Sequence, residues 1–155
     1  MHKTPEITRL IHDNLWIIVS YAFAQPVVAD VVRLQFAGDW KYLKRSMDQY
    51  AEMRADRALL EMATQLRVLD DAHGLSDIYR KQKHPPLGHV IQADDTRSDL
   101  HFRDLTNKAM HGTKYEWRLG GKDPTIIVHS GQPDRWKYAE IDIIALMALV
   151  GGLAF

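Results

Sequence analysis

The chain has 155 residues, no cysteine, and 20 basic against 20 acidic side chains, so its formal net charge is zero. This length is typical of a single domain spanning residues 1–155, because domains cluster around 100–150 residues. The lack of cysteine excludes a disulfide framework and a thiolate zinc finger, and it fits a reducing, cytoplasmic location. The balanced charge argues against a wholly basic nucleic-acid-binding surface and against a polybasic membrane anchor.

The N-terminal segment is predicted to be helical. Thr4 and Pro5 suit a helix N-terminus, and the apolar residues that follow recur at helical spacing. We expect this helix to stop or kink before Pro26, which leaves residues 27–34 ambiguous between strand and helix. Its apolar stretch Leu15–Ala24 is shorter than the roughly 20 residues of a membrane span, so a buried helix and no membrane contact are expected.

A longer helical pattern follows, from Gly38–Asp39 to His73, and Gly74 suits its C-cap. Apolar residues keep helical spacing on both sides of a phase slip at Arg54–Arg57, which predicts a break or a stutter. At ~1.5 Å per residue, an unbroken helix of this length would measure about 50 Å. Because this exceeds the diameter of a compact domain, we expect the helix either to break or to protrude towards a partner.

Residues 76–96 are expected to form a loop, because this segment is basic and rich in proline. His84 and His89 lie in it, and Asp94–Asp95 follow, so it could ligate zinc or a harder cation. The two histidines do not have the spacing of a helical metal-binding pair, however. A solvated loop is therefore favoured, and neither a metal nor another cofactor is predicted.

The C-terminal third is predicted to contain a helix, a β-meander and a last helix. The first helix begins after Ser98, a suitable N-cap, and ends at His111 before Gly112. Three segments have the pattern of strands: Lys114–Leu119, Thr125–His129 and Arg135–Ile141. Asp142 then suits the N-cap of a final helix, Ile143–Val150. The predicted fold class is mainly α, a helical bundle with a small antiparallel two- or three-stranded β-meander before the C-terminal helix.

The strongest candidate site lies on the helix that ends at His111. Arg103, Asn107 and His111 are four residues apart and form a stripe along one side of it. Arginine can hold a phosphate, asparagine can orient a neighbour, and histidine can transfer a proton near neutral pH. These groups suit attack of a ribose 2′-oxygen on the adjacent phosphate without a metal. In the alternative interpretation, Asn107 and His111 only organise the turn into the meander.

The segment Leu105–Gly112 resembles the Asn-Lys-x-x-His stretch of the HEPN-like helical superfamily, and the order of elements over residues 39–155 is also similar. The resemblance implies a metal-independent endoribonuclease that works as a homodimer, with a cleft shared between paired motif helices. It also implies that His111 is the acid–base, Arg103 the phosphate clamp and Asn107 the orienting residue. The superfamily signature has arginine directly before the polar residue, where this chain has Thr106.

The region around this helix is locally basic, with 8 basic and 5 acidic residues between positions 97 and 137. Aromatic residues alternate with these charges, a combination that suits single-stranded RNA. Lys108, Lys114 and Trp117 are therefore the candidate substrate-binding residues. In the alternative interpretation, the aromatic residues cover the core face of the hairpin and the charges face water.

Two functional hypotheses follow. The first is a HEPN-like RNA- or nucleotide-directed protein, a dimer whose most specific activity would be metal-independent RNA cleavage. The second is a non-catalytic helical interaction or scaffold module, in which Asn107 and His111 have structural roles only. The two differ in where they place Arg103, Asn107 and His111, since catalysis requires all three to be exposed in one cleft.

Overall fold

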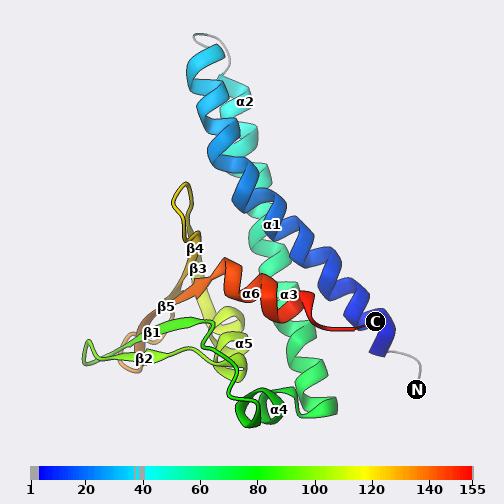
Figure 1. The fold of residues 1–155 in the computed structure, drawn as a ribbon. Helices are drawn as coiled ribbons and strands as arrows, with labels where there is room; N and C mark the ends of the chain where they lie inside the picture. Colours follow the sequence, from blue (N-terminus) through cyan, green and yellow to red (C-terminus); the bar gives the residue numbers. More distant parts are fainter. Residues whose placement is uncertain (1–3, 37, 39–40, 155) are drawn as a thin grey trace.

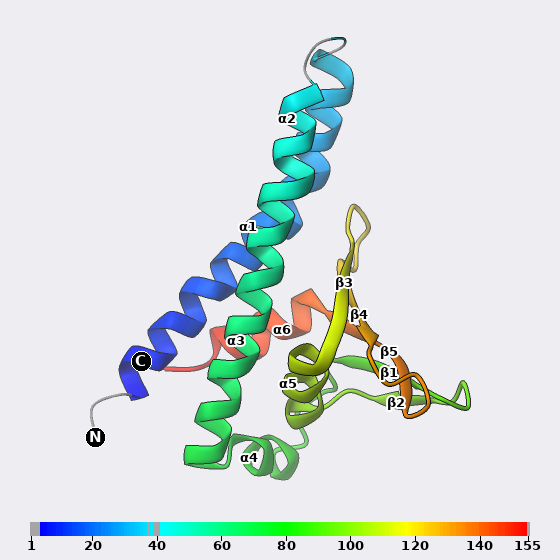
Figure 2. The ribbon, with the colours of Figure 1, turned by 180° about the vertical axis from the view of Figure 1, so that it is seen from behind.

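A long helical hairpin and an antiparallel sheet make up most of the fold (Figure 1). The structure is a computed structural model that describes residues 4–36, 38 and 41–154. One arm of the hairpin is the helix α1 (Thr4–Gln35). The other arm runs through α2 (Lys41–Arg45), the π-helix η1 (Ser46–Ala51) and α3 (Glu52–His73). The end of α1 at Gln35 and the start of α2 project beyond the rest of the described chain in both views (Figures 1 and 2).

The second arm ends at the predicted residue, but its irregularity lies at a different position from the predicted one. Gly74 caps α3 in the left-handed conformation, at φ 66°, and its N–H donates to the carbonyl of Asp70. α3 runs through Arg54–Arg57 without a break, and the irregularity lies just before it, in η1. A π-helical turn inserts one residue into the helical repeat, which accounts for the shifted apolar phase. The predicted start at Asp39 lies outside the described residues.

α1 continues through Pro26, where a stop or kink was predicted. Proline removes one helical hydrogen bond, but packing can outweigh that cost. Here the residues before Pro26 pack along α3, and Val32 after it is also buried. Among the described residues, one helix, Pro5–Gln35, is long enough and apolar enough to cross a membrane. This corrects the expectation that the apolar stretch of this segment is too short for a membrane span. The core helix of a soluble protein or a signal sequence can have the same length and composition. In this helix, 22% of the most apolar 18-residue window is buried.

The predicted loop over residues 76–96 is wrong, because most of it is regular structure. It contains α4 (Leu75–Lys81) and the strand β1 (Gly88–Gln92), which pairs with β2 (Arg97–Asp99). Gly88 has φ +145°, and a Cβ there would lie 1.8 Å from the Glu140 carbonyl oxygen, so only glycine allows this close approach. Ser98 lies within β2 and is not a helix cap.

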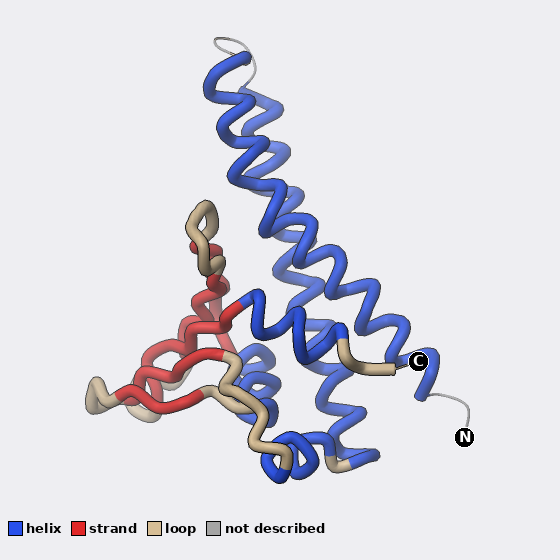
Figure 3. The backbone as a smooth tube through the Cα atoms, in the orientation of Figure 1, coloured by secondary structure: helices blue, strands red, loops and turns tan. Residues whose placement is uncertain are grey.

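The sheet is larger than the predicted meander. The expected strands are present as β3 (Gly112–Arg118), β4 (Thr125–Ser130) and β5 (Trp136–Asp142). β1 and β2 extend the sheet beyond β5, giving the order β2-β1-β5-β4-β3 with every neighbouring pair antiparallel. Figure 3 shows the strands gathered beside the helical hairpin. The fold is therefore mixed α/β and rich in helix, and the mainly α prediction holds only in part.

Two short helices complete the core. α5 (Phe102–His111) lies between α3 and the sheet. α6 (Ile143–Gly151) follows β5, and the Asp142 carboxylate caps it by accepting from the N–H groups of Ile144 and Ala145, as predicted. Side chains from α1, α3, α5, α6 and the strands form one buried apolar cluster. The helical hairpin and the sheet therefore share a core, and α5 lies at the junction between them.

Candidate functional site

Thr106 shows which face of α5 is turned to the core. It is fully buried, together with Phe102, Leu105 and Ala109. The Thr106 hydroxyl donates to the Arg103 carbonyl oxygen at 2.8 Å. An arginine at this position, as in the superfamily signature, would place its guanidinium in the apolar core. The departure from the signature therefore has a structural basis in this chain.

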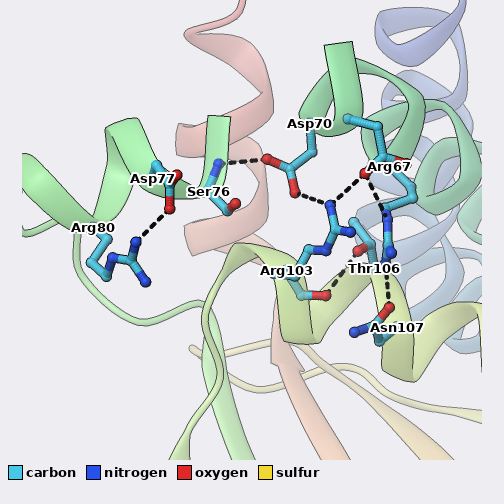
Figure 4. A network of polar contacts seen from close by, with 9 residues as sticks. Arg67, Asp70, Ser76, Asp77, Arg80, Arg103, Thr106 and Asn107 are labelled. Carbon is cyan, nitrogen blue, oxygen red and sulfur yellow. Dashed lines mark hydrogen bonds and ion pairs between the residues drawn. The ribbon is translucent and has the colours of Figure 1, made fainter. Parts of the chain in front are cut away.

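Arg103 points from α5 to the C-terminal end of α3, where it pairs with two carboxylates (Figure 4). Its Nη1 lies 2.6 Å from Asp70 Oδ2 and 2.7 Å from Asp71 Oδ1. Asp70 also accepts the backbone N–H of Ser76 at 2.7 Å, which anchors the start of α4. Burial acts to raise the pKa of Asp70, but the hydrogen bonds from Ser76 and Arg103 outweigh it and lower that pKa. Arg103 therefore joins α5, α3 and α4.

Asn107 belongs to the same helix interface. Its Oδ1 accepts a hydrogen bond from Arg67 Nη1, and Arg67 Nε also donates to Asp71 at 3.3 Å (Figure 4). Arg67 and Arg103 thus share the Asp71 carboxylate. Arg103 and Asn107, two members of the predicted catalytic stripe, therefore make contacts that hold α5 against α3.

His111 lies at the opposite end of α5, on the rim of a cavity of about 710 Å³. We call this cavity the α5 cleft. It is formed by the C-terminal half of α5, the end of β1 and the turn between β4 and β5, with these lining residues: Gln92, Asn107, Lys108, His111, Gly131, Gln132, Arg135 and Trp136. Arg103 instead lines a separate cavity of about 410 Å³ at the N-terminal end of α5. The structure thus brings Asn107, Lys108 and His111 together and separates Arg103 from them.

A glycine directly follows His111 where α5 meets the sheet. α5 passes directly into β3 at Gly112, without a linker. A Cβ at this position would lie 2.4 Å from Val128 Cγ1 and 3.2 Å from the Lys108 carbonyl oxygen. A side chain at position 112 would therefore require Val128 to shift, and glycine avoids this close approach where α5 meets β3.

The α5 cleft is cationic. Lys108 Nζ lies 4.4 Å from the centroid of the Trp136 ring, a cation–π contact, and burial lowers the pKa of Lys108. Arg135 is exposed on the turn between β4 and β5, which is held by its own N–H donating to the Gln132 carbonyl oxygen at 2.9 Å. None of the described residues that line the cleft is acidic. Amide, guanidinium, ammonium and imidazole groups thus surround one space, a combination that suits an anion.

Arg135 is the residue that the sequence analysis missed as part of the site. It is the first residue of the predicted strand Arg135–Ile141, directly before the aromatic residue Trp136. The pairing of a basic residue with an aromatic one was the available signal. Their approach to α5 depends on the sheet topology, which local sequence patterns do not give.

The other two candidate substrate-binding residues lie outside the α5 cleft. Lys114 is exposed on β3, opposite His129 on β4. Trp117 Nε1 donates to Asp56 Oδ1 at 2.7 Å, and its ring meets Tyr21 edge to face at 5.1 Å between centroids. Trp117 therefore links the sheet to the helical hairpin. This contact fits the alternative in which the aromatic residues cover the core.

The two histidines considered for metal binding have other contacts. His84 Nδ1 lies 3.0 Å from the Pro85 carbonyl oxygen, and His89 Nδ1 lies 3.7 Å from Asp99 Oδ1. Within the part of the chain that the structure describes, His and acidic side chains form no group of three or more that could hold a metal ion. The segment is instead part of α4 and the β1–β2 hairpin.

A scan against protein-family models, a search of curated proteins and a search of solved structures return no match for this chain. The chemistry of the α5 cleft is therefore inferred from the contacts of its own residues.

Proposed function

We propose that this protein binds RNA or a nucleotide phosphate in the α5 cleft, as a HEPN-like RNA-directed protein. The observation that carries the proposal is the grouping of Lys108, Arg135 and His111 around one cavity with no acidic side chain among its described lining residues. The two cationic side chains and the imidazole favour a phosphate. The amides of Gln92, Asn107 and Gln132 can recognise ribose or base groups at the same place.

Arg135 is the phosphate-binding arginine in this proposal, in place of Arg103. A guanidinium that already bridges two carboxylates must lose those ion pairs before it can hold a phosphate. Arg135 needs no such exchange, since it is exposed and pairs with no carboxylate among the described residues. Its planar fork can bind two phosphate oxygens at once.

Metal-independent RNA cleavage is the most specific form of the proposal. His111 would take the proton of a ribose 2′-hydroxyl as the oxygen attacks the adjacent phosphate, and a proton must then reach the departing 5′-oxygen. Asn107 uses its Oδ1 to accept from Arg67, which leaves its Nδ2 group to donate to a ligand in the cleft. Arg135 would stabilise the charge that develops on the phosphate.

The experiment is RNA binding followed by RNA cleavage, both in EDTA. A labelled single-stranded oligonucleotide is titrated with wild-type protein, Lys108→Gln and the control Arg118→Gln, an exposed cation on β3 outside the cleft. Loss of a charged contact costs about 1.5–3 kcal/mol, so Lys108→Gln should weaken binding by about 10- to 100-fold and Arg118→Gln by less than twofold. No binding by the wild type, or equal losses in both variants, would overturn the proposal.

Cleavage is measured with the same oligonucleotide on wild type and His111→Ala. Abolished cleavage with retained binding would support His111 as the acid–base. Equal cleavage by both proteins, or none by either, would leave only the binding function. The non-catalytic interaction module is the second candidate function, and the network of Arg67, Asp70, Asp71, Arg103 and Asn107 is the observation that favours it.

A further inference from the structure

An apolar stripe on α1 is left uncovered by the rest of the chain. Its members are Trp16, Phe23, Val27 and Leu34, and the exposed fractions of these residues are 63%, 47%, 63% and 66%. At 3.6 residues per turn these four positions fall within about 40° of one another around the helix axis. The buried residues Ile11, Leu15, Ile18 and Ala22 lie on another side of α1, about 130° away, where the helix meets the core. α1 thus has two apolar faces, and the fold covers one.

The spacing of the stripe is that of a helix–helix contact. Its members are separated by seven, four and seven residues, so they occupy four of the six positions of a heptad seam, and Ser20 and Asp30 occupy the other two. The pattern predicts a narrow seam that packs against another helix. A flat lipid surface would instead favour a broad apolar face with basic residues beside it, and α1 carries only one basic residue, Arg33, between Leu15 and Gln35.

The stripe is complementary to itself in the antiparallel direction. Its positions are symmetric about residue 25, because 16 and 34 lie nine residues from it and 23 and 27 lie two residues from it. In a two-fold dimer of antiparallel helices, Trp16 would therefore meet Leu34 of the second copy, and Phe23 would meet its Val27. Each contact joins a large aromatic ring to a smaller aliphatic side chain.

Charge and area also fit a second copy. The chain has no net charge, so two copies do not repel each other over distance. Asp30 and Arg33, the two charged residues of α1 beyond Leu15, pair with each other at 3.3 Å. The four stripe side chains expose on the order of 450 Å², more than half of the ~800 Å² that each partner contributes to an ordinary stable interface. Val28 and Val31, both partly exposed beside the stripe, add to this area.

We propose that this stripe binds the same stripe of a second copy, antiparallel, about a two-fold axis near residue 25. The homodimer then forms through α1 and not through paired motif helices as the resemblance implies, and the α5 cleft remains a feature of each single chain. The proposal does not depend on the RNA-directed function, because no α1 residue is among the described residues that line the α5 cleft.

Chemical cross-linking tests the direction of the contact, since the chain has no cysteine of its own. Trp16→Cys should not cross-link to itself with a short bismaleimide, because the two copies of position 16 would lie about 27 Å apart along the helices. A mixture of Trp16→Cys and Leu34→Cys should give the mixed dimer, and Val27→Cys should cross-link to itself. Self-cross-linking of Trp16→Cys would indicate a parallel contact and overturn the proposal.

Sedimentation equilibrium at micromolar concentration tests the contact itself. The wild type should have twice the 17.8 kDa mass of one chain. Phe23→Glu and, separately, Val27→Glu should be monomeric with an unchanged circular dichroism spectrum. The matched control Leu60→Glu, which changes an exposed apolar residue of α3, should stay dimeric. A monomeric wild type, or one that binds neutral phosphatidylcholine vesicles through Phe23 without forming a dimer, would overturn the proposal.

Discussion

The two ends of α5 carry similar cationic residues whose contacts differ. At its N-terminal end, Arg103 pairs with Asp70 and Asp71 and holds two helices together. At its C-terminal end, Lys108 and His111 meet Arg135 around a cavity without acidic lining residues. Arg103 is close to His111 in sequence, but its guanidinium is occupied by two carboxylates. Arg135 is distant in sequence, yet it lines the same cavity as His111. The partners supplied by the fold decide which cation is available to a ligand.

Thr106→Arg is the change that should affect the protein most, because it places at a fully buried position the arginine that the HEPN-like signature has there. A guanidinium there would be buried among apolar side chains and exceeds the volume of threonine, so we expect a loss of at least about 3 kcal/mol in the free energy of unfolding. Urea unfolding followed by circular dichroism measures it. A stable Thr106→Arg variant with gained RNA cleavage would show that this face of α5 is not core.

Asp70→Ala should cause the next largest loss of stability, because the side chain of Asp70 is 1% exposed and binds both Arg103 and the Ser76 N–H. Removing one partner of a buried pair costs about 3–5 kcal/mol, and we expect about 2–3 kcal/mol here because Arg103 is partly exposed. The control Asp77→Ala breaks the exposed pair with Arg80 and should cost less than about 0.5 kcal/mol. Equal unfolding free energies for the two variants would contradict a structural role for the Arg103 network.

Trp117→Phe should have a smaller effect, limited to stability. It keeps an aromatic ring near Tyr21 but removes the hydrogen bond to Asp56, whose pKa burial raises despite that bond. We expect a loss of about 1 kcal/mol in the free energy of unfolding and no change in RNA affinity. A clear fall in RNA affinity would instead indicate that Trp117 binds the substrate, as predicted from the sequence.

Acid should weaken the Arg103 network in a defined pH range. Since the pKa of Asp70 is lowered from its ordinary 3.8 in the folded protein, its ion pair stabilises the fold above about pH 3.8 and is lost as the pH falls through the lower, folded value. The stability difference between wild type and Asp70→Asn should therefore shrink on going from pH 5 towards pH 2. A difference that stays constant over this range would show that the Asp70 charge contributes nothing.

Local sequence signals predicted the parts of the fold that depend on neighbouring residues. Gly74 and Asp142 act as the expected caps, and the meander of β3, β4 and β5 follows from alternation and turn residues. β1 was missed because its five residues lie among proline and charged residues and are stabilised by pairing with β5, some 50 positions away. The helix through Pro26 depends on packing in the same way.

The candidate site was predicted in part for the same reason. Asn107, Lys108 and His111 share the α5 cleft because they lie on one side of a single helix, and helical spacing is visible in the sequence. The partners of Arg103 lie more than 30 residues earlier, on α3, and Arg135 comes from a turn between two strands. Contacts of this kind are set by tertiary structure, so no local pattern separates the paired arginine from the available one.

The most direct test compares RNA affinity in Arg135→Gln and Arg103→Gln, titrated side by side with the same single-stranded oligonucleotide at low salt. Each variant removes one positive charge, so a general electrostatic effect would weaken both equally. A phosphate held in the α5 cleft predicts a loss of about tenfold for Arg135→Gln and less than twofold for Arg103→Gln. A larger loss in Arg103→Gln would contradict the assignment and return the site to the N-terminal end of α5.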